Sequence, residues 1–346
     1  MPMNETLGAK ARAAWDGVRR RFGGTDLKSG VKGGVNRLNE GPRHWRVVKW
    51  TVAVIVVFCL LYYPIGMALM SKVNDDPDFA PPEIAEGQSQ AVAMTMALID
   101  REVNQTGWRA NDPFFMPSAA LDNMPNFQLG LFGALSRFAV ELSDQLGRTR
   151  GSSQVDPDVE KAVGLLKYPG DVWIFNFSTS FLPTASSESQ YLGAYRALGR
   201  YNDRLANASA IFERRADNLI ATLDRIGSDL GSASAQLDGR IQSGGGLIFD
   251  RSSDDVFYRV KGRLYGYYLI LRALGKDFDA VIRDKDLTSA WEQMLGSFRL
   301  AATLDPLVVS NCAPDSQACP SHLASQGFYL LRARTQLQEV SNILLK

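Results

Sequence analysis

The spacing of apolar residues is helical from about residue 88 to the end of the chain. Apolar positions recur every three or four residues, which is the pattern of a helix with one buried face. Seven segments carry this pattern: 88–103, 125–146, 158–168, 191–237, 256–278, 287–304 and 321–345. The sequence therefore predicts an all-α fold, a bundle of about six to eight helices formed by residues 88–346.

The longest apolar pattern runs from Tyr191 to Leu237. Its spacing alternates between three and four residues, with a local break after Phe212, as in a coiled coil or a long bundle helix. Such a seam packs either inside one chain or against a second copy in a homo-oligomer. A chain of this length can bury its own seam, so we expect the seam to lie in the core.

One segment resembles a strand, DVWIFNFSTSFLPTAS, residues 171–186. No other segment offers a partner strand, so an apolar helix or a buried connection fits it equally well. The glycine-rich segment 242–255 marks a clear break between helices.

The stretch GWRANDPFFMPSAALDNMPNFQ, residues 107–128, combines large apolar side chains with three prolines. Its prolines fall where helix boundaries are expected, which favours a buried corner between two core helices. We therefore expect Trp108, Phe114 and Phe127 to be buried within the monomer. The alternatives are a partner or ligand surface formed by Trp108, Phe114 and Phe115, and a contact with the membrane.

Residues 50–70 contain no charged side chain. As a helix, these 21 residues extend over roughly 31 Å, about the thickness of the hydrocarbon core of a bilayer. A cleaved signal peptide is the competing interpretation, but its charged leader and apolar core are normally much shorter. The sequence predicts one retained transmembrane helix over residues 47–70, in a single-pass protein.

The flanks of this segment differ in charge. Residues 1–49 hold eleven Lys and Arg against four acids, whereas residues 71–86 hold one Lys against five acids. By the positive-inside rule the N-terminus lies in the cytoplasm and residues 71–346 lie outside it. We expect a basic, mostly flexible tail over residues 1–46 and an acidic, proline-rich linker over residues 71–87. The exported part is not basic, which disfavours nucleic acid as a partner.

Two cysteines lie close together in NCAPDSQACP, with turn-forming residues between them. Outside the cytoplasm, Cys312 and Cys319 can form a disulfide, which would add about 2–3 kcal/mol in the chain-entropy model. Free thiols are the main alternative. A metal site is disfavoured because His322 is the one further ligand nearby.

Catalytic signatures are absent from the sequence. The chain has two histidines, His44 in the tail and His322, and it has none of the common nucleophile, metal or nucleotide motifs. We therefore expect no enzymatic activity, no metal and no cofactor. A carboxylate-dependent cell-wall hydrolase is the alternative, because it needs no histidine; its candidate carboxylates are Glu102, Asp112, Asp122 and Glu141.

The segment GRTRGSSQVDPD, residues 147–158, places two arginines beside a small polar turn. Guanidinium groups and clustered backbone amides bind phosphate and carboxylate. An anionic lipid or glycan could therefore bind to Arg148, Arg150, Ser152 and Ser153. The alternative is a solvated loop whose arginines pair with Asp156, Asp158 or Glu160.

The order of these pieces is similar to that of a known family. The basic tail, the span, REVNQTGWRANDPFFMPSAALDNMPNFQLG, GRTRGSSQ, RADNL and GFYLLRARTQL resemble a proteobacterial membrane-protein family that is catalogued as a domain of unknown function, over about residues 45–346. The resemblance implies a mostly helical protein of the inner membrane that faces the periplasm. It supplies no catalytic residue.

These observations together predict a non-enzymatic protein anchored in the bacterial inner membrane. The expected role of its periplasmic helices is to bind partners in the cell envelope, as a scaffold or accessory protein. Binding of an anionic lipid or glycan is the first alternative.

Overall fold

The computed structural model describes residues 42–147, 155–175, 181–244, 250–317 and 319–346. Over these residues every named element is a helix, which confirms the all-α prediction. The chain divides into two compact units, Met1–Ile65 and Gly66–Lys346. The boundary falls within the last turns of α3 (Arg43–Met70), and the other helices belong to the second unit.

Helix α3 has 28 residues, and none of them is buried. Within the described residues it is the one helix that is long and apolar enough to cross a membrane. Its bounds extend the predicted span of residues 47–70 by one turn at the N-terminal side, because Arg43 and Arg46 continue the helix into the basic flank.

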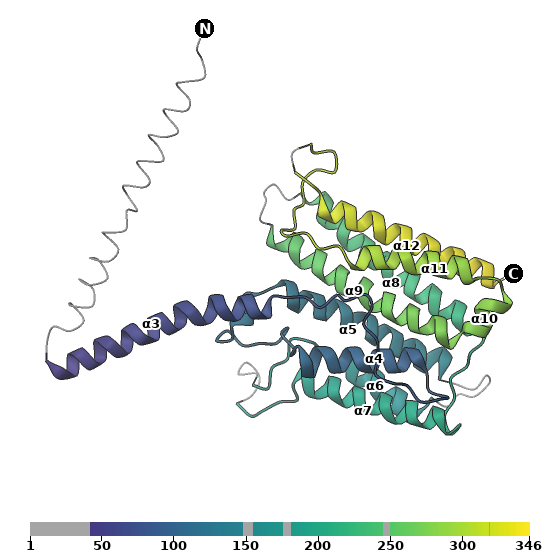
Figure 1. Ribbon diagram of the computed structural model, residues 1–346, viewed down its shortest axis with the longest axis horizontal. Helices are drawn as coiled ribbons and strands as arrows, with labels where there is room; N and C mark the ends of the chain where they lie inside the picture. Colours follow the sequence, from purple (N-terminus) through teal and green to yellow (C-terminus); the bar gives the residue numbers. More distant parts are fainter. Residues whose placement is uncertain (1–41, 148–154, 176–180, 245–249, 318) are drawn as a thin grey trace, which may run out of the picture. The chain divides into compact units, whose positions relative to one another are not determined.

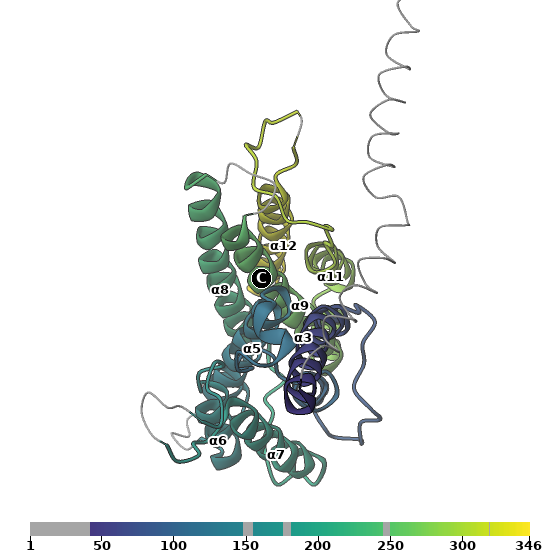
Figure 2. The ribbon, with the colours of Figure 1, turned by 90° about the vertical axis from the view of Figure 1, so that its left-hand side faces the viewer.

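The long helices of the second unit lie side by side in one bundle, and successive helices run in opposite directions (Figure 1). The helices are α4 (Gln90–Asp100), α5 (Asn123–Glu141), α6 (Pro157–Leu166), α7 (Ser187–Ala206), α8 (Ala216–Gln242), α9 (Arg251–Asp277), α10 (Asp279–Asp284), α11 (Thr288–Ala302) and α12 (His322–Leu344). A π-helical turn extends α4 over Arg101–Gln105, and another extends α5 over Leu142–Leu146. Helices α5 and α9 lie at the centre, with α8, α11 and α12 on one side and α6 and α7 on the other (Figure 2).

The central contact joins α5 to α9 and is made by glycines. Gly262 on α9 lies against the backbone carbonyl of Phe127, and Gly130 on α5 lies against the backbone carbonyl of Arg259. A Cβ atom at either glycine would overlap the facing backbone. The two helices approach this closely only because neither glycine carries a side chain.

The seam from Tyr191 to Leu237 is divided between two helices. Helix α7 ends at Ala206 and α8 begins at Ala216, and Ala208 in the connection has a φ of 53°, which no helix continues through. Helix α7 packs on α4 and α6, whereas α8 packs on α9 and α12. The apolar seam residues of α7 and α8 are buried within the single chain, so the seam forms core packing.

The acidic segment 71–87, expected to be a linker, lies along α9 and is held by side chains of that helix. Lys261 contacts the Asp75 carboxylate at 2.8 Å, and the Tyr265 hydroxyl donates to the Asp76 carbonyl at 2.7 Å. Arg272 donates to the carbonyls of Pro77 and Phe79. The segment is therefore part of the folded unit rather than a free spacer.

The corner at residues 107–128 is only partly buried. Trp108 and Phe127 lie in the core, and the Trp108 indole N–H donates to the Gly170 carbonyl at 2.7 Å. The expectation that Phe114 is buried is wrong, because its side chain is 86% exposed, and Phe115 is 45% exposed. Trp108 in turn cannot form part of a partner surface. Phe114 and Phe115 lie in a turn between Pro113 and Pro117, outside the helices.

Candidate functional site

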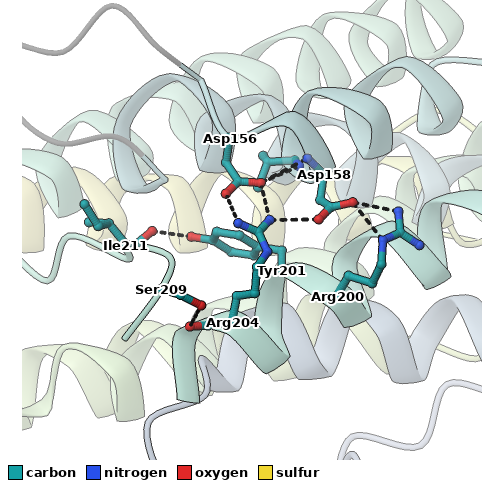
Figure 3. Close-up of polar contacts among 8 residues, drawn as sticks. Asp156, Asp158, Arg200, Tyr201, Arg204, Ser209 and Ile211 are labelled. Carbon is teal, nitrogen blue, oxygen red and sulfur yellow. Dashed lines mark hydrogen bonds and ion pairs between the residues drawn. The ribbon is translucent and has the colours of Figure 1, made fainter. Parts of the chain in front are cut away.

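The loop predicted to bind an anion lies outside the described residues, with all four of its residues: Arg148, Arg150, Ser152 and Ser153. The two carboxylates that follow the loop are bonded to α7 (Figure 3). Arg204 contacts Asp156 at 2.7 Å and Asp158 at 2.8 Å, and Arg200 contacts Asp158 at 2.6 Å. Burial raises the pKa of Asp156, but hydrogen bonds from Arg204 and from the backbone outweigh it and leave the pKa lowered. Asp156 and Asp158 therefore hold α6 against α7.

The two cysteines and His322 hold the loop between α11 and α12. Cys312 and Cys319 form a disulfide with a Cα–Cα distance of 5.8 Å. The Ser310 backbone N–H donates to Nδ1 of His322 at 3.0 Å, and the Ser310 hydroxyl donates to the Pro320 carbonyl at 2.7 Å. Burial lowers the pKa of His322. This histidine therefore closes the base of a disulfide-linked loop.

The four carboxylates considered for hydrolysis are each bound by a different arginine. Glu102 pairs with Arg101, Asp112 with Arg109, Asp122 with Arg251, and Glu141 with Arg225. Glu102 and Glu141 are almost fully buried. Each of the four carboxylates is therefore paired with an arginine of its own.

A different carboxylate lies beside Asp122. Burial, followed by the charges of Asp122 and Asp255, raises the pKa of Asp254 to about 7. Asp254 lines a pocket of about 310 Å³, and the Asn123 amide nitrogen donates to both Asp122 and Asp254. Arg251 contacts Asp122 at 2.7 Å. Nothing in the described part of the chain groups three ligands for a metal ion. The polar groups of Asp122, Asn123, Arg251 and Asp254 therefore largely satisfy one another.

A cavity whose charged lining residues are mainly cations lies between α5, α8, α9 and the segment after α6. It has a volume of about 470 Å³, within the range typical of small-molecule sites. Three cations, Arg137, Lys167 and Arg263, line it together with a single carboxylate, Asp229. Its apolar wall includes Phe132, Tyr168 and Tyr191. We call this cavity the cationic groove.

Asp229 contacts both arginines of the cationic groove only at long range. Its carboxylate lies 3.5 Å from Nε of Arg137 and 3.6 Å from Nε of Arg263, beyond an ordinary N–H···O bond. Asp229 instead accepts a short hydrogen bond from the Tyr267 hydroxyl, at 2.8 Å. Burial raises the pKa of Tyr267 well above its usual range, so this hydroxyl stays protonated and remains a donor.

Arg263 has unused hydrogen-bonding capacity in the groove. Its side chain is 16% exposed, and its Nε, which is buried, makes no hydrogen bond within the described residues. A buried guanidinium N–H without an acceptor is costly, and a bound anion would supply the acceptor. Arg137, 57% exposed, stands at the mouth. The groove can therefore receive a phosphate or carboxylate group between two arginines and a lysine.

Comparison with protein families gives one match. Residues 45–244, more than half of the 346 residues, match the family described as "Uncharacterized protein conserved in bacteria (DUF2333)". The chain belongs to the DUF2333 family. No curated protein and no solved structure matches the chain. The DUF2333 match confirms the resemblance to a family of unknown function, and it ends before α9, short of the extent expected from the sequence motifs.

The DUF2333 match includes Arg137, Lys167 and Asp229 but not Arg263. Sequence reasoning did not find these residues, because each is a single charge on a different element and no short motif links them. One signal was present. Arg263 directly precedes the apolar run of α9 in KGRLYGYYLI, in a part of the helix where most neighbouring side chains are buried. A charge in such a part of a helix is a candidate for a functional role.

Proposed function

We propose that this protein is a membrane-anchored binding protein of the bacterial cell envelope, with an anionic group as its ligand in the cationic groove. Helix α3 anchors it in the inner membrane, the N-terminal tail lies in the cytoplasm, and the helical unit lies in the periplasm. The length and apolar character of α3 support the anchor. The excess of basic residues before α3 and of acids after it supports the orientation.

The observation that carries the binding role is the excess of cations in the cationic groove. Arg137, Lys167 and Arg263 line the groove with a single carboxylate, that of Asp229. Asp229 accepts its short hydrogen bond from the Tyr267 hydroxyl. Arg263, whose buried Nε makes no hydrogen bond within the described residues, and Arg137 at the mouth are suited to a phosphate or carboxylate in this concave, partly apolar site. The aromatic wall suits a sugar ring or a glycerol backbone beside that charge. A role in binding envelope proteins stays a prediction from the sequence.

Substitution of Arg263 by glutamine is expected to weaken anion binding about tenfold to a hundredfold, because one charge-assisted hydrogen bond to a charged ligand is lost. The measurement is isothermal titration of the full chain in a neutral detergent with inorganic phosphate and with glucuronate. Binding should weaken as salt is added. The same protein is also compared in nanodiscs that contain phosphatidylglycerol and in nanodiscs of phosphatidylcholine alone. This comparison shows whether the bound anion belongs to a lipid or to a soluble molecule.

Arg332→Gln provides the matched control. Arg332 is exposed on α12 and does not line the cationic groove, so its loss removes the same charge at a distance from the site. Lys167→Gln at the exposed edge provides a second groove variant if Arg263→Gln folds poorly. Equal affinities for wild type, Arg263→Gln and Lys167→Gln would exclude the groove as the binding site.

A further inference from the structure

Exposed hydrophobic side chains gather at one end of the helical unit. Among the described residues beyond α3, twelve large hydrophobic side chains are exposed, and seven of these lie in three loops. They are Phe114 and Phe115 in the loop 106–122, Ile174, Phe181 and Leu182 in the connection from α6 to α7, and Leu307 and Val308 in the loop 303–321. The exposure is large: Phe114 is 86%, Phe181 85% and Leu307 101% exposed. Single exposed apolar residues are ordinary, but a group of this kind marks an interaction surface.

The three loops share one end of the bundle because of the order of its helices. The first follows α4, the second follows α6 and the third follows α11, and each of these helices runs toward the same end. Figure 1 shows the described parts of these loops at the end of the bundle opposite to the C-terminus. We call them the apical loops. Two of them are in contact through their rings: Phe115 stacks edge-on against Trp173 at 5.8 Å, and Trp173 against Phe175 at 5.4 Å.

Two contacts within the second unit place the end of α3 beside the apical loops. Gly66, in the last turns of α3, lies against the ring of Pro117, two residues beyond Phe115. Asp75, five residues after Met70, pairs with Lys261 at 2.8 Å, and Lys261 lies 3.7 Å from Asp305, two residues before Leu307. Five residues reach at most roughly 18 Å. The chain therefore leaves α3 next to the loops that carry the exposed apolar side chains.

We propose that the apical loops insert their aromatic and aliphatic side chains into the surface of the bilayer that α3 crosses. This inference rests on α3 being a membrane anchor, as proposed above. Phenylalanine, tryptophan and leucine are the side chains that bury favourably at the boundary of headgroups and acyl chains. A lipid surface is the occupant that the anchor brings to these loops in every molecule, whereas a protein partner would have to be recruited. The helical unit thereby stands on the membrane through three loops as well as through α3.

The depth of single labelled positions tests this arrangement in the full chain. Phe114→Cys, Leu307→Cys and Ile211→Cys are made in a Cys59→Ala background, labelled with the fluorophore NBD and reconstituted in phosphatidylcholine nanodiscs. Ile211 is the control because it is exposed, at 42%, but lies in the connection from α7 to α8 at the other end of the bundle. Lipids that carry a nitroxide should quench positions 114 and 307 several-fold more than position 211, with blue-shifted emission.

A quenching at positions 114 and 307 no greater than at position 211 would overturn the inference. Quenching that grows with the number of chains per nanodisc would also overturn it, since the occupant would then be a second copy. Native Cys59, labelled in the otherwise unchanged chain, reports on α3 separately. If Cys59 is quenched and the loops are not, the anchor stands and the loop insertion fails. If Cys59 is not quenched, the anchor and the inference that rests on it both fail.

Discussion

Substitution of Gly262 by alanine is expected to lower the free energy of unfolding by about 3 kcal/mol, the upper part of the range for overpacked cores. The added Cβ would overlap the backbone carbonyl of Phe127 rather than the end of a flexible side chain. Relief then requires α5 and α9 to move apart along their whole contact. Urea unfolding of the full chain in mild detergent, followed by tryptophan fluorescence, measures the loss.

Gly296 provides a matched control for this prediction. It lies on the exposed side of α11, and a Cβ there would meet nothing within 4 Å. Alanine at Gly296 should stabilise the protein by about 0.5–1 kcal/mol, because it restricts the unfolded chain and favours the helix. Gly130→Ala should cost about as much as Gly262→Ala, and the double variant should cost less than their sum, since one separation of the helices relieves both overlaps. Equal stability changes at Gly262 and Gly296 would contradict the proposed close contact.

Loss of Arg101 is the second change with a large expected effect. Arg101 and Glu102 form an ion pair in the π-helical turn after α4, with side chains 2% and 0% exposed. The Arg101 guanidinium also lies between the rings of Phe79, at 4.7 Å, and Tyr265, at 5.1 Å. Arg101→Met leaves the Glu102 carboxylate buried without its partner, so we expect a loss of about 3–5 kcal/mol.

The double variant Arg101→Met with Glu102→Leu distinguishes a broken pair from lost packing. Removing both charges removes the uncompensated carboxylate, so the double variant should be more stable than Arg101→Met alone. Arg215→Ala serves as the exposed control, because Arg215 pairs with Asp217 where both side chains are about half exposed, and such pairs contribute at most about 1 kcal/mol. Additive losses in the double variant would show that the pair does not act as a unit.

The sequence predicted the helices well because their apolar spacing is regular. Most predicted segments match observed helices within a few residues. The break inside the seam was harder to place, since Ala208 and Phe212 continue the apolar spacing through residues that are not helical. Apolar spacing reports which face is buried but not where the backbone turns.

The candidate site could not be predicted in the same way. Arg137, Lys167 and Arg263 come from three separate elements, and the packing of α5 against both α9 and α6 brings them to one cavity. For Phe114 the sequence predicted burial where the structure shows exposure. A large apolar side chain between prolines suggests a core position, but the sequence does not show what surrounds it. Charge clusters and exposed apolar loops both depend on tertiary placement, whereas helix spacing is local.

The proposed function and the insertion of the apical loops both require that α3 stays in the chain as a membrane anchor. The most direct measurement is the intact mass of the protein, expressed from the printed sequence and recovered from membranes after a carbonate wash. We expect the chain to remain in the membrane fraction at its full 38.1 kDa. A shortened, soluble product that begins after residue 70 would contradict it, because the apolar segment would then be a cleaved signal.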